Sequence, residues 1–341
     1  MKISIDNERK LIINLLEKYG AETKEANVVA DVIVDGDLKG FSTHGLGRFP
    51  QYIKSIEYGT IKTDAEYEIE SETVSAAIIN GNHKFGQYVT VKGMDLAVKK
   101  AQETGIGVVG IHDSNHYGIA GYYADIASIQ DMIGIVISNT EPAIAPFGGK
   151  KALLGTNPIT ISVPSDQFYI CVDMATSVTA RGKLLELKRK GEELPEGMAL
   201  DSEGKPTTNP EEGLNGSILP FGGFKGYALA FMFEILAGPL VKAAYGEAVK
   251  GTATPDEECT KGDLLIAINP DKLGGAGEFK LEVDDFVRGI KEEGGVVPGD
   301  REMENIQKNR QEGIPVDETL YQQLKDIANK VDYEIDKFFD E

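Results

Sequence analysis

The first sixty residues carry apolar side chains at intervals of three and four, a spacing that predicts amphipathic helices. One helix is expected over residues 6–19, because its leucines and isoleucines share a stripe and Gly20 follows it. A second helix is expected over 23–38, just ahead of Gly40, and a short third helix over 52–58. The chain therefore begins with a helical segment whose second helix leads into a glycine-rich box.

Farther along, runs of β-branched residues alternate with helical periodicity. Strands are expected over 106–111, 133–137, 159–163, 169–173 and 264–268, and helices over 91–104, 120–129, 303–311 and 316–336. Alternation of this kind predicts an α/β fold with a mixed central sheet. We expect the two ends of the chain to form one helical domain, residues 1–75 together with 300–341, beside a mixed α/β domain over 76–299.

Two other segments lack this alternation. Residues 188–216 are rich in glycine, proline and acidic side chains and show no periodicity, so a long functional or interfacial loop is expected there. The apolar stretch 227–245 is interrupted by Glu234, Pro239 and Lys242. We interpret this stretch as a buried helix rather than a membrane span.

Charge and composition narrow the function. The formal net charge of −20 over 341 residues argues against nucleic acid and anionic membranes as partners, and it means that an anionic substrate needs a locally basic pocket. Cys171 and Cys259 are too few for a disulfide framework or a zinc cluster. The first residues lack the apolar region of a signal peptide, so a cytoplasmic protein is expected.

Two of the four histidines lie in small, glycine-containing boxes, Gly40-Phe-Ser-Thr-His44-Gly-Leu-Gly-Arg48 and Ser114-Asn-His116-Tyr-Gly118. Histidine transfers protons near neutral pH, and the arginine fork fits a carboxylate. His44, His116 and Arg48 are therefore candidate catalytic residues acting on a small organic acid. The structural alternatives are a histidine that closes a helix C-terminus for His44, a hydrogen-bonded loop histidine for His116 and a surface charge for Arg48.

Two familiar motifs are present only in part. Gly105-Ile-Gly-Val-Val-Gly110 matches the dinucleotide fingerprint, but its spaces hold β-branched residues, so we place its glycines inside a strand and expect no Rossmann turn. His112 and His116 have the four-residue spacing of a zinc motif, yet the residues between them disfavour a helix. No metal site is expected, and a histidine-ligated metallohydrolase is kept as the alternative function.

Three further segments offer groups that suit a cofactor. Asp173 ends an apolar strand, where its carboxylate could orient a histidine, hold a ribose hydroxyl or cap the following turn. Asn157 lies in a Gly-Thr-Asn-Pro turn with free backbone N–H groups. Lys225 follows two glycines at the start of a helix, which together make a plausible phosphate site without a Rossmann turn.

In chain order these boxes resemble the second malate/lactate dehydrogenase family, which is unrelated to the Rossmann dehydrogenases and includes ureidoglycolate, sulfolactate and diketogulonate enzymes. The matching segments span nearly the whole chain: Ser42–Gly45 with Arg48, Asn115–Gly118, Pro146–Gly149, Gly155–Pro158, Asp173–Thr176, Gly182-Lys183, Phe224–Gly226 and Pro298–Arg301. The resemblance implies a dimeric oxidoreductase that uses NAD or NADP, bound on an unusual mixed sheet, to interconvert small 2-hydroxy and 2-oxo acids.

The resemblance also implies residue roles. His44 and His116 match histidines implicated in proton transfer, and Arg48 would hold the substrate carboxylate. The cofactor-contact segments match Thr140, Asp173, Met174, Ala175, Thr176, Lys225, Gly299, Asp300 and Arg301. Asp300 departs from the glutamate or glutamine expected in many relatives. Malate and sulfolactate both fit as substrates, and Arg181 or Lys183 could meet their second anion.

Overall fold

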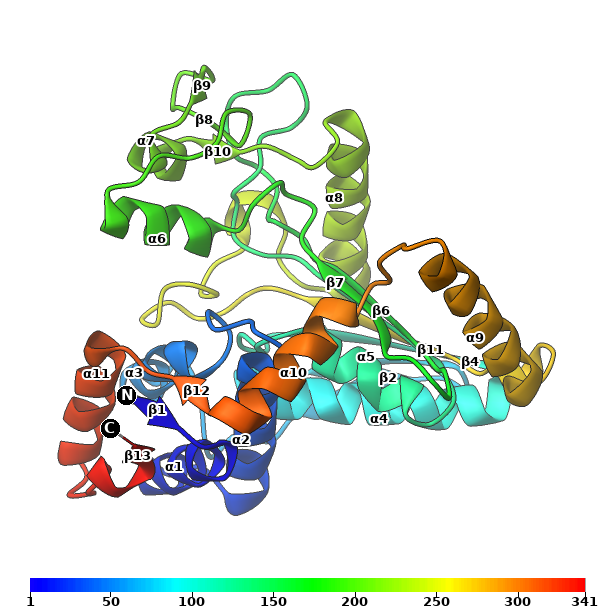
Figure 1. Ribbon diagram of the computed structural model, residues 1–341, viewed down its shortest axis with the longest axis horizontal. Helices are drawn as coiled ribbons and strands as arrows, with labels where there is room; N and C mark the ends of the chain where they lie inside the picture. The colour runs from blue at the N-terminus through cyan, green and yellow to red at the C-terminus, as the bar shows by residue number, and fades with distance from the viewer. Residues whose placement is uncertain (341) are drawn as a thin grey trace.

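The computed structural model describes residues 1–340, which form a helical region, a central sheet and a smaller lobe (Figure 1). Both chain ends lie in the helical region. The smaller lobe, which carries α6 and α7, lies at the same end of the sheet as the helical region and across from it. The mixed α/β fold and the helical region built from both termini are as predicted.

The central sheet has seven strands in the order β2-β3-β4-β11-β5-β6-β7. Their bounds are β2 Glu68–Glu72, β3 Ala76–Asn80, β4 Ile106–His112, β5 Ile133–Ser138, β6 Ile159–Val163, β7 Ile170–Met174 and β11 Asp263–Ile268. Only β3 and β4 pair in parallel, and every other neighbouring pair is antiparallel. Strand β11 comes late in the chain but inserts between β4 and β5, which brings its first residues to the end of β4.

Helices cover both faces of this sheet (Figure 1). Helices α4 (Gly86–Thr104) and α5 (Gly121–Ser128) pack on one face, and α8 (Phe224–Ala237) packs on the other. Side chains alternate accordingly along β11: Leu265 belongs to the core beneath α4, and Leu264 to the core beneath α8.

The glycines of the partial dinucleotide fingerprint serve this packing. Gly105 caps α4 in the left-handed conformation, with φ of 91°. Gly107 lies inside β4, where a Cβ atom would come within 1.9 Å of the Ala97 carbonyl oxygen of α4. Glycine at 107 is therefore required for close contact between helix and strand, and the prediction that this motif is no Rossmann turn is confirmed. Gly107 and Gly110 lie inside β4 as predicted, whereas Gly105 precedes the strand.

The helical region has one core built from both ends of the chain, with Leu15, Phe49 and Leu324 among its members. Its elements are α1 Ile5–Lys18, α2 Thr23–Leu38, α3 Phe49–Tyr58, α10 Asp300–Glu312 and α11 Glu318–Asn329, with a small sheet of β1 Lys2–Ile3, β12 Ile314–Pro315 and β13 Phe339–Asp340. Strand β2 lies within residues 1–75, which we expected to belong to the helical domain, yet it pairs in the central sheet. The division of the chain into two domains stays a prediction.

The expected long loop over 188–216 is wrong. This segment lies within the smaller lobe, which consists of α6 Arg181–Lys190, α7 Pro210–Asn215 and a three-stranded sheet of β8 Ala199–Leu200, β9 Pro206–Thr207 and β10 Ser217–Ile218. The lobe has its own small core, which includes Leu184, Leu194 and Ile218. Elements of two to six residues are too short to show a hydrophobic period, which is why the sequence pattern missed them.

The prediction that residues 227–245 form a buried helix is correct only for one face. Helix α8 ends at Ala237, and Phe231 and Met232 on its other face are 45% and 50% exposed. Among the described residues, Phe224–Val241 is the one helical stretch with the length and apolar composition of a membrane span. Helix α9 (Ala276–Glu292), which the sequence pattern did not predict, also exposes Leu281 and Phe286.

Candidate active site

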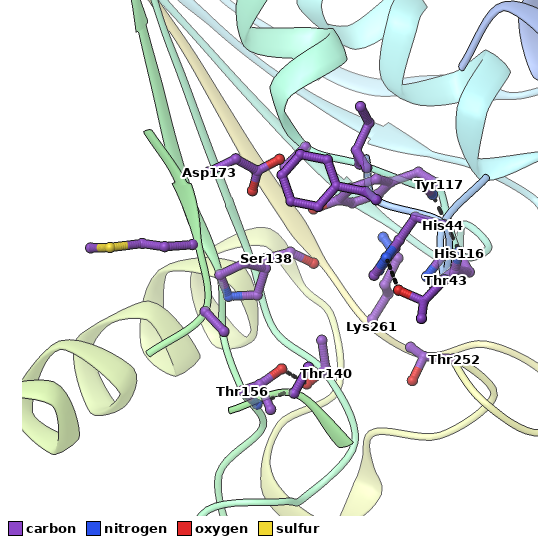
Figure 2. Close-up of a pocket in the computed structure, with 18 residues that line it drawn as sticks. Thr43, His44, His116, Tyr117, Ser138, Thr140, Thr156, Asp173, Thr252 and Lys261 are labelled. Atoms are coloured by element: carbon purple, nitrogen blue, oxygen red, sulfur yellow. Dashed lines mark hydrogen bonds between the residues drawn. The ribbon is translucent and has the colours of Figure 1, made fainter. Parts of the chain in front are cut away.

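A cavity of about 280 Å³ is lined by residues of the helical region, of the end of the sheet and of the segment that leads into the smaller lobe. Its wall includes His44, His116, Tyr117, Thr140, Asp173 and Lys261 (Figure 2). In the view of Figure 2 the two histidines and Lys261 lie on one side, and Asp173 lies on the other. The fold thus brings both histidine boxes to one pocket, although they are 72 residues apart in the chain (His44 to His116).

His44 is held by the turn that ends α2. Gly40 takes a φ of 87°, and the Leu46 N–H donates to Oδ2 of the buried Asp37 at 2.5 Å. A Cβ atom on Gly45 would lie 2.1 Å from the Asp37 carboxyl carbon, so only glycine lets the loop pass this close. The loop that carries His44 is therefore fixed against the last turn of α2.

His116 follows β4, and its Nδ1 atom receives two hydrogen bonds. The Gly118 N–H donates to Nδ1 at 3.2 Å, and the Tyr52 hydroxyl lies 2.8 Å from the same atom. Because a backbone N–H can only donate, Nδ1 is an acceptor, and the proton of the neutral ring is on Nε2. The His44 ring stacks on the His116 ring with centroids 5.5 Å apart.

Both histidines are neutral in the free protein at neutral pH. Burial, and next the charge of Arg48, lowers the pKa of His44 to about 4. The same two causes, with the charge of Lys261 and any proton taken up by the neighbouring His44, hold the pKa of His116 well below its usual value. A neutral imidazole can accept a proton from an alcohol or donate an N–H hydrogen bond to a carbonyl oxygen.

Arg48 lies behind the wall of the pocket rather than in it. Its Nη2 donates to the backbone oxygen of Thr252, a residue that lines the cavity. Its Nε is buried and has no hydrogen-bond partner among the described residues. Burial lowers the pKa of Arg48, and its charge acts on both histidines.

Lys261 and Tyr52 are site residues that the sequence analysis missed. Lys261 lines the pocket, and its Nζ lies 2.5 Å from Oδ2 of Asp263 and 4.2 Å from the centre of the Tyr117 ring. In the sequence, Lys261 stands two residues before Asp263, which opens an apolar strand, and this position could have marked it as a candidate. Tyr52 lies on the buried stripe of α3, where an ordinary core role was the simpler interpretation.

Four predicted cofactor residues line the cavity: Thr140, Asp173, Met174 and Ala175. The Asp173 carboxylate accepts hydrogen bonds from the Gly121 N–H and the Thr160 hydroxyl, both at 2.8 Å. The carboxylate thereby accepts from a free backbone N–H in the first turn of α5. It caps this helix, which is distant in sequence, and not the turn that follows β7. Burial raises the pKa of Asp173, which these hydrogen bonds partly offset.

The other predicted cofactor residues lie outside this wall. Asn157 is buried, and its Nδ2 donates to Glu234 Oε2 at 2.6 Å; the Thr176 hydroxyl donates to the Thr156 oxygen at 2.9 Å. Lys225 is exposed in the first turn of α8. Gly299, Asp300 and Arg301 begin α10, where Asp300 pairs with Lys291 at 2.6 Å. Their contacts with a cofactor stay predictions.

His112 has charged partners of its own. Its Nδ1 lies 2.9 Å from Asp113, and its Nε2 lies 3.3 Å from Glu70 on β2. Within residues 1–340, histidine, cysteine, aspartate and glutamate side chains form no group of three or more that could hold a metal ion.

The fold and the pocket together define an α/β protein with a mixed, non-Rossmann sheet and a pocket lined by two stacked histidines. The chain belongs to the malate/L-lactate dehydrogenase family, whose sequence model matches residues 3–325. It is 60% identical to the malate/(S)-sulfolactate dehydrogenase of Methanothermus fervidus, over 98% of this chain and 99% of that protein. It is 56% identical to the L-sulfolactate dehydrogenase of Methanothermobacter thermautotrophicus, over the same shares of the two chains.

Solved structures agree with this assignment. The sulfolactate dehydrogenase from Methanocaldococcus jannaschii superposes with a TM-score of 0.95 at 48% identity, covering 100% of both chains. The malate dehydrogenase from Pyrococcus horikoshii gives a TM-score of 0.89 at 33% identity, covering 98% of this chain and 96% of that one. The resemblance drawn from the sequence boxes is confirmed.

Proposed function

We propose that this protein is a dehydrogenase that uses NAD or NADP to interconvert a small 2-hydroxy acid and the corresponding 2-oxo acid. Malate with oxaloacetate and sulfolactate with sulfopyruvate are the substrate pairs that we favour. The observation that carries the proposal is the stack of His44 on His116, with Lys261 in the same wall and Arg48 behind it, in a chain of this family. The relatives named for these substrates support it.

The pocket has the chemistry that a nicotinamide cofactor needs. Met174, Ala175 and Pro158 give it an apolar wall, and Thr140 and Thr156 place hydroxyl groups beside that wall. An apolar surface suits the face of a nicotinamide ring, and hydroxyl groups suit its carboxamide. When bound, the cofactor would supply or accept the hydride. A relative from Chromohalobacter salexigens is named for NADP(+).

The protein would supply the proton. Reduction of a 2-oxo acid adds a hydride to C2 and a proton to the C2 oxygen, and oxidation removes both. The Nε2–H of His116 can donate a hydrogen bond to that oxygen, because Nδ1 is the acceptor of two donors in the free protein. The transferred proton would come from the imidazolium form, in which Nδ1 carries the second proton, the Tyr52 oxygen accepts from it and the Gly118 N–H gives up its contact. An anionic substrate beside His44 and His116 would raise their pKa values, so that protonation accompanies substrate binding.

Arg48 would attract the carboxylate at C1. Its buried charge lies close enough to lower the pKa values of both histidines, and its Nε has no partner among the described residues. A carboxylate would satisfy that donor once the Arg48 side chain turns from Thr252 toward the cavity, and the pair would then hold C2 in place for transfer.

Turnover assays test this proposal. The purified protein is mixed with oxaloacetate, sulfopyruvate, pyruvate or 2-oxobutyrate and either NADH or NADPH, and the nicotinamide absorbance is followed. We expect oxidation of the reduced cofactor with at least one of the acids. No turnover with any acid, together with stoichiometric zinc and hydrolytic activity, would instead favour the metallohydrolase alternative.

We also propose a cytoplasmic homodimer that covers the exposed face of α8. That face is apolar and continuous with an aromatic row in which Phe147, Phe224 and Tyr227 have ring centroids 5.6 and 6.0 Å apart. Exposed apolar patches of this kind mark protein interfaces. Light scattering after size exclusion should give a dimer mass, and Phe231→Glu should give a monomer. Phe286→Glu, on α9, is the matched control, and a monomeric parent protein contradicts the proposal.

A further inference from the structure

We infer that Lys261 binds the second anion of the substrate, a carboxylate or sulfonate attached to the carbon next to C2. This inference rests on the proposed function and adds to it the residue that selects acids with two negative charges over acids with one. It begins from the position of one buried ammonium group in the wall of the pocket.

Lys261 is held rigidly where it meets the cavity. The residue is only 2% exposed, its Nζ lies 2.5 Å from Asp263 Oδ2, and it lies 4.2 Å from the centre of the Tyr117 ring. Tyr117 is itself buried, and its backbone oxygen accepts a hydrogen bond from the Tyr123 hydroxyl. A lysine fixed between a carboxylate and an aromatic face loses little freedom when it binds a ligand.

The ammonium group has donors left for a ligand. It carries three N–H groups, and one hydrogen bond, to Asp263, is found among the described residues. A buried lysine–aspartate pair is seldom worth its desolvation in stability alone, so a ligand role explains the pair better than a structural one. The charge also acts on His116, whose pKa it helps to lower, which places Lys261 within electrostatic range of the reacting centre.

The other cations near the site are less suited to this task. Arg48 is expected to hold the first carboxylate, and Lys183 pairs with Glu186 at 3.0 Å on the exposed side of α6. Lys225 is exposed and lies outside the cavity wall. Arg181 is the strongest competitor, because it follows Ala180, which lines the cavity, although its own side chain is exposed.

Substrate selectivity of a Lys261 variant tests the inference. Lys261→Met keeps the length of the side chain and removes its charge. We expect kcat/KM to fall about a hundredfold for oxaloacetate and sulfopyruvate, the size of a lost hydrogen bond to a charged group. Loss of the charge near His116 acts on every acid alike, so the deciding quantity is the ratio: for 2-oxobutyrate, which has a similar length and one charge, we expect a loss at least about tenfold smaller. The ratio of oxaloacetate to sulfopyruvate turnover in the parent protein identifies which second anion is preferred.

Controls keep the result decisive. Lys261→Met leaves Asp263 buried without its partner, so the double variant with Asp263→Asn is measured in parallel, and both are checked by thermal unfolding. Arg181→Met and Lys183→Met are the matched surface controls and should retain the preference for two charges. Equal losses for all acids in a folded Lys261 variant, or loss of the preference in Arg181→Met instead, would overturn the inference. Absence of turnover in the parent protein would refute the proposed function itself.

Discussion

The phenol oxygen of Tyr52 lies 2.8 Å from Nδ1 of His116, and this contact links α3 of the helical region to the loop after β4. With the Gly118 N–H on the same nitrogen, it fixes both the tautomer and the orientation of the imidazole. Tyr52 is 1% exposed, and burial raises its pKa well above the usual value. The phenol therefore keeps its proton and acts as a donor to His116.

Tyr52→Phe removes one of the two donors to His116. We expect kcat to fall about tenfold, the equivalent of about 1.4 kcal/mol, because the ring loses a neutral hydrogen bond that orients it. Affinity for the reduced cofactor should not change. Tyr58→Phe, at the exposed end of the same helix, is the control and should leave kcat as it is. An unaltered kcat in Tyr52→Phe would show that the Gly118 contact suffices.

His116→Ala removes the side chain that we expect to serve the C2 oxygen. Turnover should fall by about 10² to 10⁴, the usual contribution of a positioned acid or base. Fluorescence titration should still detect binding of the reduced cofactor, since the cavity wall on the Asp173 side is untouched. His44→Ala is measured alongside, and the larger loss assigns the proton donor. Retained activity in His116→Ala removes that residue from the mechanism.

The pH dependence of stability should carry a contribution from His44. Its pKa is about 4 in the folded protein and about 6.5 in the unfolded chain. Between these values the unfolded chain binds a proton that the folded protein does not, so the free energy of unfolding falls as the pH falls. The fall should reach up to about 1 kcal/mol per pH unit in this window.

Urea unfolding of the parent protein and of His44→Gln at pH 7 and pH 5 checks this. Other groups titrate in the same range, Asp37 among them with a pKa of about 6, so the difference between the two proteins is the quantity to follow. The parent protein should lose more stability on acidification than His44→Gln. An equal loss of unfolding free energy in the two proteins would mean that His44 is not buried in its neutral form.

Local patterns predicted the elements that have a long apolar period or a continuous β-branched run. Strand β6 spans the predicted residues 159–163, and α2 spans the predicted 23–38. The pattern failed for α9, whose apolar Leu281 and Phe286 face outward, and for the short elements of the smaller lobe. A periodic pattern arises where apolar side chains are buried on one face of an element. In α9 large apolar side chains are exposed, and in the smaller lobe the elements have too few residues to show a period.

The site was predicted where the chemistry lies in a contiguous box and missed where it depends on long-range pairing. His44 and His116 could be picked out because glycine and hydroxyl residues surround them. Lys261 reaches the pocket only because β11 inserts between β4 and β5, which pairs Asp263 with both Ile111 and Ser138. Nothing near Lys261 in the sequence encodes that pairing.

Asp37 should prove to be a positioning residue for the loop that carries His44 and Arg48. Its Oδ2 accepts from the Leu46 N–H, and burial, with the charge of Asp37 after it, raises the pKa of the neighbouring Glu8 well above its usual value. Asp37→Ala leaves the buried Leu46 N–H without an acceptor, which should cost about 1–3 kcal/mol of unfolding free energy.

Asp37→Asn separates positioning from bulk stability, because its amide oxygen can still accept from Leu46. We expect Asp37→Ala to raise KM for the 2-oxo acid and lower kcat, and Asp37→Asn to recover most of both. Gly45→Ala should match Asp37→Ala, since its methyl group would overlap the Asp37 carboxyl group. Cofactor affinity should be the same in all three variants. If KM for the acid is unmoved in Asp37→Ala while stability falls, Asp37 supports the fold and leaves the site alone.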